Sequence, residues 1–202
     1  MALVGIVTTG VANLASVRAA FTRLGIETDL IEQPNKILSS EYLFLPGVGT
    51  FGAAAMQLNQ HNLTGALRER ISLRQPTLAI CAGMQLFFDS SDESPNTQGL
   101  GIIPAHVEKI NAPGLAIPQM GWNNVAPLND FSAFQDGYAY FANSYAFPAI
   151  EIPGWKTAVF DYGGKYTAAL QSGNVLACQF HPELSGTWGQ AVIQNWLKAA
   201  SC

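Results

Sequence analysis

Hydrophobic residues in the first half of the chain fall into short apolar runs that alternate with amphipathic segments. The run at residues 3–7 is continuous, which is expected of a strand buried on both faces of a parallel sheet. Runs of this kind predict four strands, at residues 3–7, 28–31, 42–45 and 77–80. The first two flank a helical segment, so the chain is expected to open with a β-α-β unit.

Helical spacing is clearest in three places. Gly25 ends the first predicted helix, whose apolar positions are Leu14, Val17, Phe21 and Leu24. Residues 52–74 read as a helix in two pieces, broken at 60–63. The last element, residues 187–200, is predicted to be an amphipathic helix whose inward positions are Val192, Ile193, Trp196 and Leu197.

After residue 101 the pattern changes to short strand-like segments joined by turns. These predicted strands are residues 105–110, 122–125, 138–147, 155–160, 167–171 and 175–180. The sequence therefore predicts an α/β fold: an open, mostly parallel doubly wound sheet with helices on both faces, extended by antiparallel strands in the second half. No repeat or linker divides the chain, so residues 1–202 are expected to form a single domain.

Composition narrows the class of protein. Of 202 residues 49% are hydrophobic and 12% charged, with a net charge of −4 and no basic run, so no nucleic-acid partner is expected. No stretch of 18 apolar residues predicts a membrane span, and residues 3–7 are too short for a signal-peptide core. Three widely spaced cysteines form no metal-ligand pattern, which predicts no metal site and favours the reducing cytoplasm.

Cys81 is the leading candidate nucleophile. The strand at 77–80 stops at this residue and a helix is expected to begin near Gly83 or Met84, which places the thiol between a strand end and a helix start. Unpaired N–H groups at a helix start favour a thiolate and an oxyanion. The alternative is that Cys81 is a small buried hydrophobic residue, the commoner fate of a lone cysteine.

Two further segments end strands in the same way. His181 and Glu183 follow the strand at 175–180 and could converge with Cys81 if the two strands are parallel neighbours, with the carboxylate orienting the imidazole. The glycine-rich segment at 46–52 can present N–H groups to a ligand. It lacks the G-K-[ST] ending of a phosphate loop, and a plain tight turn is its alternative interpretation.

Five segments, in this order and spacing, carry a resemblance to a known family. They are L-P-G-V-G-T-F-G, I-C-A-G-M-Q-L, P-Q-M-G-W-N, Y-F-A-N-S-Y and Q-F-H-P-E-L-S-G. The chain resembles the class I glutamine amidotransferases over essentially its entire length. Within that family it is most similar to the glutaminase subunits of imidazole glycerol phosphate synthase, to which M-G-W-N and H-P-E-x-S-G are specific.

The resemblance implies a catalytic triad of Cys81, His181 and Glu183 that hydrolyses glutamine to glutamate and ammonia without a metal or organic cofactor. The implied oxyanion donors are the N–H of Ala82 and the strand around Val48 and Gly49, after a peptide flip. The implied substrate-binding residues are Gly47, Gln85, Glu93, Ser144 and Tyr145, the last two through their backbone.

The resemblance also implies a partner. Glutaminase subunits of this kind form a heterodimer with a (β/α)₈-barrel cyclase subunit, which uses the ammonia in histidine biosynthesis. Asn13, Trp122 and Asn123 match positions near that contact, and simple core packing is the alternative for Trp122. The chain departs from the family pattern at five positions, Thr8, Ala79, Gln119, Asn143 and Leu184. Of these, Thr8, Gln119 and Leu184 are expected to lie toward the partner.

Other functions remain open at this stage. A paralogous glutaminase subunit could feed ammonia to another synthase, such as one that amidates surface sugars, with the same catalytic residues. A non-catalytic scaffold has no need of Cys81, His181 and Glu183 together. The vitamin B6-type glutaminases are disfavoured because their G-G-E-S segment is absent. An unrelated cysteine hydrolase or redox protein is disfavoured by Gln85, by M-G-W-N and by the lack of a resolving cysteine near Cys81.

Overall fold

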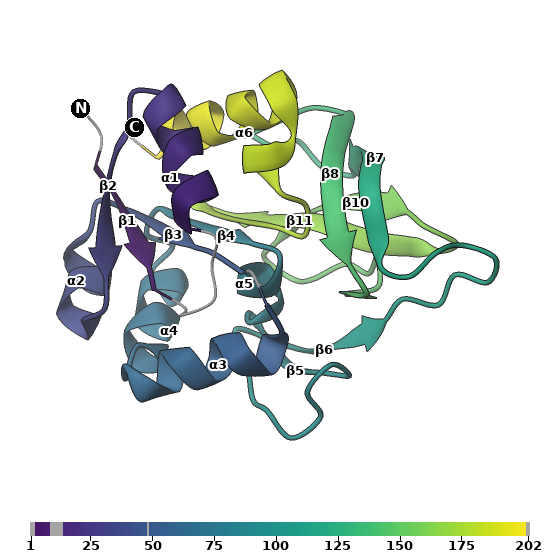
Figure 1. Cartoon of the computed structure of the whole chain (residues 1–202), viewed down its shortest axis with the longest axis horizontal. Helices are drawn as coiled ribbons and strands as arrows, with labels where there is room; N and C mark the ends of the chain where they lie inside the picture. The colour runs from purple at the N-terminus through teal and green to yellow at the C-terminus, as the bar shows by residue number, and fades with distance from the viewer. Residues whose placement is uncertain (1–2, 9–13, 48, 201–202) are drawn as a thin grey trace.

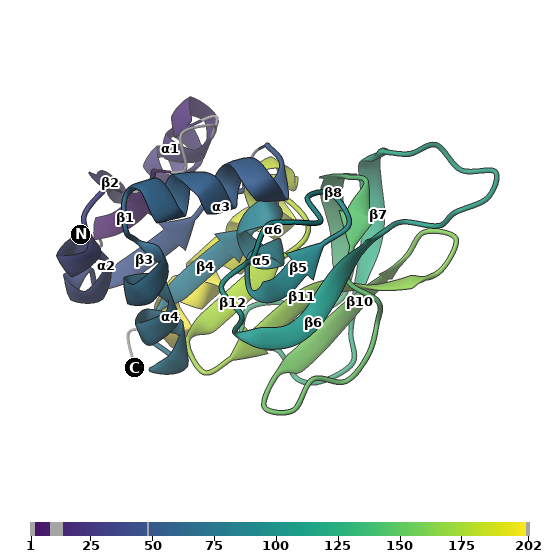
Figure 2. The same cartoon turned by 90° about the horizontal axis from the view of Figure 1, so that it is seen from below.

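The computed structural model describes residues 3–8, 14–47 and 49–200. A nine-stranded sheet with the order β2-β1-β3-β4-β12-β11-β10-β7-β8 forms its centre (Figures 1 and 2). The first five strands in this order are parallel and the rest are antiparallel. The nine strands are β1 (Leu3–Val7), β2 (Glu27–Ile31), β3 (Tyr42–Leu45), β4 (Thr77–Ile80), β7 (Gln119–Pro127), β8 (Gly137–Asn143), β10 (Lys156–Asp161), β11 (Lys165–Ser172) and β12 (Val175–Cys178).

Helices cover both faces of the sheet, as the sequence predicts. In Figure 1, α1 and α6 lie above the sheet and α3 and α4 lie below it. The helices are α1 (Leu14–Arg23), α2 (Pro34–Ser39), α3 (Phe51–Gln60), α4 (Thr64–Ser72), α5 (Ala82–Gln85), the 3-10 helix η1 (Pro182–Leu184) and α6 (Gly186–Ala199). A second, three-stranded sheet has the order β5-β6-β9 and comprises β5 (Phe88–Ser91), β6 (Ile103–Lys109) and β9 (Tyr145–Ala146).

Strand alternation divides the buried side chains into two cores. In β3, Tyr42 and Phe44 belong to the core that includes Phe21 of α1 and Trp196 of α6. Leu43 and Leu45 belong to the other core, with the buried residues of α3 and α4. Successive side chains of a strand point to opposite faces, so a strand covered on both sides must be continuously apolar. The apolar runs of the sequence are therefore explained by the two helical layers.

The structure differs from the sequence predictions in four places. The sequence predicted neither α2 nor β5, although its strand at 105–110 corresponds to β6, and it predicted an elbow helix that continues to the polar segment at 89–98. The helix α5 spans only four residues because residues 99–103 return to pair with the chain just after it. Leu100 N–H donates to Leu86 O and Ile102 N–H to Phe87 O, so β5 forms instead of further helical turns. The predicted strand at 138–147 is broken at Ser144, between β8 and β9.

Candidate active site

Cys81 lies at a strained backbone position between two strand ends. It follows β4 with φ 54° and ψ −118°, values that a residue with a side chain rarely adopts, and α5 begins at the next residue. Its N–H donates to the carbonyl of Cys178 (2.7 Å), the last residue of β12. Because β4 and β12 are parallel neighbours, their carboxyl ends meet at one sheet edge, as the sequence analysis required.

The segment after β3 packs its backbone directly on this elbow. A Cβ on Gly47 would overlap the backbone nitrogens of Ala82 and Gly83, so only glycine fits here. The Ala82 N–H donates to Gly47 O (3.3 Å), so this predicted oxyanion donor is already engaged. Gly49 adopts φ 99°, and Val48 lies outside the described residues. The oxyanion roles of Val48, Gly49 and Ala82 stay predictions.

His181 is held rigidly beside the elbow. Its N–H donates to Tyr140 O of β8 (2.9 Å), and its carbonyl accepts from Ser185 Oγ (2.6 Å). Ser185 Oγ in turn accepts from Tyr140 N (2.9 Å), which closes the link to β8. His181 Nδ1 lies 2.8 Å from Glu183 Oε1, and both side chains are buried. A carboxylate only accepts hydrogen bonds, so Nδ1 carries the proton and Nε2 is left for Cys81.

Burial and neighbouring groups shift the pKa values of His181 and Cys178. Burial lowers the pKa of His181, but hydrogen bonds to Cys81 and Glu183 outweigh burial and raise this pKa to about 10. The imidazole is therefore a strong base held against the Cys81 thiol. Burial, followed by the charge of Glu183, raises the pKa of the Cys178 thiol, so that thiol stays protonated. Glu183 Oε2 is buried and has no hydrogen-bond partner among the described residues.

A cavity of about 290 Å³ joins the candidate catalytic residues. Five predicted residues line it: Gly47, Gly49, Cys81, His181 and Glu183. Leu184, which is 47% exposed, also lines this cavity, so it lies close to the protein surface. The thiol, the base and the base's carboxylate partner thus face one small chamber, an arrangement suited to nucleophilic attack on an acyl group.

Of the predicted substrate residues, Gly47 lines this cavity and the other four do not. Gln85 is buried, and its Nε2 donates to Tyr145 O (3.0 Å) and to Gln179 Oε1 (2.9 Å). Glu93 Oε2 accepts from Phe51 N (2.6 Å) at the start of α3. Ser144 O accepts from Ile110 N. Gln85 and Tyr145 are thus linked through Gln179 to Cys81, and the roles of all four residues toward glutamine stay predictions.

Gln179 is a site residue that the sequence analysis missed. Its side-chain amide lies 3.6 Å from Cys81 Sγ, and the residue is 1% exposed. The available signal was a polar residue inside the apolar run V-L-A-C-Q-F, two positions before His181. A buried amide in such a strand needs a polar partner, and the nucleophile supplies one.

The predicted partner residues differ in their surroundings. Trp122 is 57% exposed and packs edge-on against Tyr140, so simple core packing does not describe it. The neighbouring Asn123 side chain donates to Asp161 O within the chain. Asn13 lies outside the described residues. These three interface roles stay predictions.

The residues that depart from the family pattern fall into two groups. Leu184 is exposed, and its place toward a partner stays a prediction. Thr8 and Gln119 are buried, so neither side chain is part of the exposed surface, and their place toward a partner stays a prediction. Thr8 Oγ1 donates to Ile31 O. Gln119 is aligned with the buried Asn143 on the neighbouring strand, and both belong to the interior. Ala79, which stands beside the elbow, is a fully buried member of the second core.

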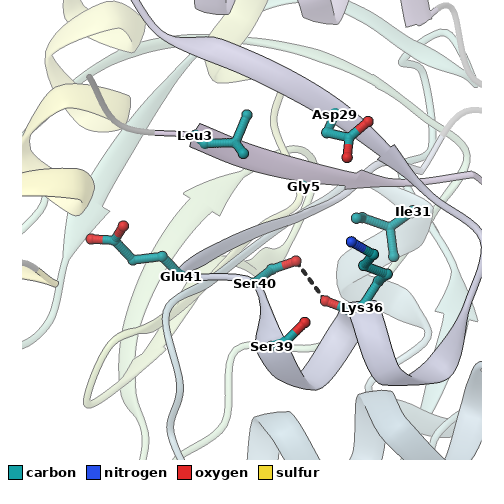
Figure 3. Close-up of a pocket in the computed structure, with 8 residues that line it drawn as sticks. All are labelled: Leu3, Gly5, Asp29, Ile31, Lys36, Ser39, Ser40 and Glu41. Atoms are coloured by element: carbon teal, nitrogen blue, oxygen red, sulfur yellow. Dashed lines mark hydrogen bonds between the residues drawn. The ribbon is translucent and has the colours of Figure 1, made fainter.

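A separate hollow of about 210 Å³ lies at the β2 edge of the sheet, apart from Cys81 (Figure 3). Charged and hydroxyl side chains surround it, including Asp29, Lys36, Ser40 and Glu41, and Ser40 Oγ donates to Lys36 O (2.6 Å). None of the predicted site residues lines this hollow. In the part of the chain that the structure describes, no group of three His, Cys, Asp or Glu side chains could hold a metal ion, and no helix is long and apolar enough to cross a bilayer.

Comparisons with known proteins agree with this geometry. The chain is 42% identical over 197 residues to the imidazole glycerol phosphate synthase subunit HisH of Escherichia coli (strain K12). The matched region covers 96% of this chain and 97% of the relative. It is 41% identical over 188 residues to the HisH subunit of Carboxydothermus hydrogenoformans, covering 91% and 92%.

Solved structures and a family model lead to the same group. A crystal structure of a glutamine amidotransferase matches with a TM-score of 0.77 at 21% identity, covering 98% of this chain and 99% of the other. The structure of PurLQS from Thermotoga maritima matches with a TM-score of 0.73 at 18% identity, covering 98% of each chain. At these identities the structures establish the fold alone. The model for "Glutamine amidotransferase class-I" matches residues 6–200, and the chain therefore belongs to the class I glutamine amidotransferase family.

Proposed function

We propose that this chain is the glutaminase subunit of an imidazole glycerol phosphate synthase. It hydrolyses glutamine to glutamate and ammonia and passes the ammonia to a cyclase subunit. The observation that carries the proposal is the cavity in which Cys81 meets His181, itself paired with Glu183 at 2.8 Å. The identity of 42% to the HisH subunit supports this choice of synthase.

The proposed reaction begins when His181 takes the proton of the Cys81 thiol. The sulfur attacks the side-chain amide carbon of glutamine, and a tetrahedral oxyanion forms. The C–N bond then breaks as His181 returns the proton to the departing ammonia, which leaves a glutamyl thioester on Cys81. Water hydrolyses the thioester to glutamate and free thiol, with His181 as the base. Glu183 keeps the imidazole oriented throughout.

Stabilising the oxyanion requires a local rearrangement. The Ala82 N–H donates to Gly47 O, so a developing oxyanion cannot use this donor until that carbonyl moves away. A flip of a peptide in the segment at 47–49 would free the Ala82 N–H and turn a second N–H toward the cavity. The positive φ of Gly49 supports this role, because glycine tolerates both backbone states.

Glutamine is proposed to be held by the residues around the cavity. The backbone of Gly47, Ser144 and Tyr145 supplies polar contacts, and the side chains of Gln85 and Glu93 recognise the amino acid. Glu93 carries the negative charge that an α-ammonium group needs. Its carboxylate accepts a hydrogen bond from the N–H of Phe51, which is two residues beyond the segment at 47–49.

The proposed partner is a (β/α)₈-barrel cyclase subunit in a heterodimer. Support comes from an apolar surface of Met120, Trp122 and Tyr138 on β7 and β8, all of which are exposed. Trp122 lies near Gly186 at the start of α6, just after Leu184 of the cavity wall. A partner docked there would cover the cavity and receive ammonia directly, with Asn13 and Asn123 at the contact. The three widely spaced cysteines show no disulfide pattern, which supports a reducing, cytoplasmic location.

The test is glutamate release from glutamine by this chain alone, with the cyclase subunit, and with that subunit plus its nucleotide ligand. Glutaminase activity is expected to be low alone and high in the full mixture, and to vanish in Cys81→Ala. Activity of the chain alone that no cyclase stimulates would contradict this partner and favour a paralogous synthase. No Cys81-dependent glutamate under any condition would favour a non-catalytic scaffold.

A further inference from the structure

Gln179 lies directly behind the nucleophile and belongs to no predicted role. It follows β12, one residue after Cys178, and its backbone N–H donates to Ala168 O (2.8 Å), so its main chain is fixed. The side chain is almost completely buried. Its Nε2 lies 3.6 Å from Cys81 Sγ, within hydrogen-bonding range for a sulfur acceptor. The thiol therefore has two polar neighbours, His181 and Gln179.

A fixed carbonyl determines which end of the Gln179 amide faces the sulfur. The Tyr145 carbonyl can only accept, so Gln85 must present its NH₂ group there (3.0 Å). The same NH₂ group lies 2.9 Å from the Gln179 side chain, which must therefore present its oxygen to Gln85. The Gln179 NH₂ group is then left for Cys81 Sγ. Three hydrogen bonds in series, from the Tyr145 carbonyl through Gln85 and Gln179 to Cys81, thus determine the orientation of the Gln179 amide.

We propose that Gln179 is a positioning residue for the Cys81 nucleophile: its amide N–H donates to the sulfur, favours the thiolate over the thiol and keeps Sγ aimed into the cavity. The catalytic part of this inference rests on the proposed glutaminase function, but the effect on the sulfur does not. Gln85 acts one step further back, because it holds the Gln179 amide in the donating orientation.

The thiol and thiolate forms of Cys81 differ in how strongly a hydrogen-bond donor stabilises them. A hydrogen bond to a charged acceptor is roughly twice as strong as one between neutral groups, so a buried N–H stabilises the thiolate selectively. His181 is the base, and it loses the proton that it could donate to the sulfur when it protonates the ammonia. The Gln179 amide carries no titrating proton, so its hydrogen bond persists through each step of the proposed reaction.

The test measures Cys81 alkylation by iodoacetamide between pH 5 and pH 10, with peptide mass spectrometry to separate Cys81 from Cys178 and Cys202. Gln179→Met, of similar length but without a donor, is expected to move the midpoint of the alkylation profile upward by about one pH unit, equivalent to a tenfold change in thiolate population. Gln179→Glu is expected to move it further, because a carboxylate repels the thiolate. The matched control is Gln171→Met, another buried glutamine, whose amide bonds Ser132.

Glutaminase kinetics give the second measurement. Gln179→Met is expected to lower kcat at neutral pH about tenfold with little change in KM, and to recover part of the loss at higher pH. Circular dichroism checks that each variant folds, and if Gln179→Met does not, Gln179→Glu carries the test. An alkylation midpoint equal to that of Gln171→Met would overturn the proposal. If the midpoint moves while the wild-type complex releases no glutamate, Gln179 has the proposed role and the glutaminase function is wrong.

Discussion

Gly47 and Gly83 face one another so closely that neither position admits a side-chain carbon. A Cβ on Gly47 would overlap Gly83 N, and a Cβ on Gly83 would overlap Leu45 O. The chain after β3 therefore lies backbone to backbone on the elbow that carries Cys81. This contact is what brings the Gly47 carbonyl onto the Ala82 N–H.

Gly47→Ala is expected to destabilise the protein by about 2 kcal/mol or more and to abolish most glutaminase activity, because the methyl group must push the segment away from the elbow. Urea unfolding and glutamate release measure the two effects. The matched control is Gly65→Ala in α4, where a Cβ meets no atom within 4 Å. That control is expected to change stability by less than about 1 kcal/mol, in the stabilising direction. Equal effects of the two substitutions would show that close packing at Gly47 is unimportant.

Backbone strain at Cys81 predicts an unusual order of stability among its variants. Alanine keeps the penalty of φ 54°, whereas glycine adopts this conformation at no steric cost. Cys81→Gly is therefore expected to be more stable than Cys81→Ala by about 1 kcal/mol, the reverse of the usual ranking, while both lack activity. Thermal unfolding of the two variants decides this point, and a more stable alanine variant would argue against strain at the elbow.

The raised pKa of His181 predicts how stability depends on pH. A group whose pKa rises on folding contributes stability that is complete below its unfolded pKa and is lost as pH rises through the folded value. Stability is therefore expected to fall between about pH 6.5 and about 10, by at most about 5 kcal/mol, since one pKa unit corresponds to about 1.4 kcal/mol. In Glu183→Gln the loss should be smaller and should end at a lower pH. Unfolding titrations at several pH values measure this slope, and an unchanged slope in that variant would be evidence against the His181–Glu183 pair.

Arg70 is expected to be essential for stability although it lies away from the active site. Its guanidinium is fully buried and donates to the carbonyls of Ile37, Ser40, Glu41 and Pro76, and burial lowers its pKa to about 10. Arg70→Met leaves these oxygens without donors and is expected to cost about 3 kcal/mol or more in urea unfolding. The exposed Arg18→Met provides the comparison, with an expected change within about 0.5 kcal/mol. A loss as small as that of Arg18→Met would mean that water replaces the guanidinium.

Sequence patterns predicted the strands that helices cover on both faces of the sheet. The runs at β1, β3 and β4 must be apolar because helices cover both faces, and Cys81 and His181 converge because their strands are parallel neighbours. Strand β5 escaped prediction because it depends on contacts between residues 86–88 and residues 99–103, which local periodicity does not encode. That residues 1–202 form one domain stays a prediction.

Several contacts in the site also depend on residues far apart in the sequence, so they could not be predicted from local patterns. Nothing local to Gln179 reveals that its amide meets Cys81, since the two residues are 98 positions apart. The engaged Ala82 N–H likewise follows from the packing of Gly47, not from the sequence near Ala82. The burial of Thr8 and Gln119 could not be inferred from a resemblance, because a polar residue type does not determine which way a strand residue faces.

The contacts of Tyr140 also cover part of a free sheet edge. β8 is the last strand of the nine-stranded sheet, and the free edge of such a strand can recruit a strand of another molecule. Here the outward N–H and C=O of Tyr140 are bonded to Ser185 and His181. The catalytic segment thus caps the middle of the edge strand. A substitution that loosens this segment would therefore unmask a template for aggregation as well as impair catalysis.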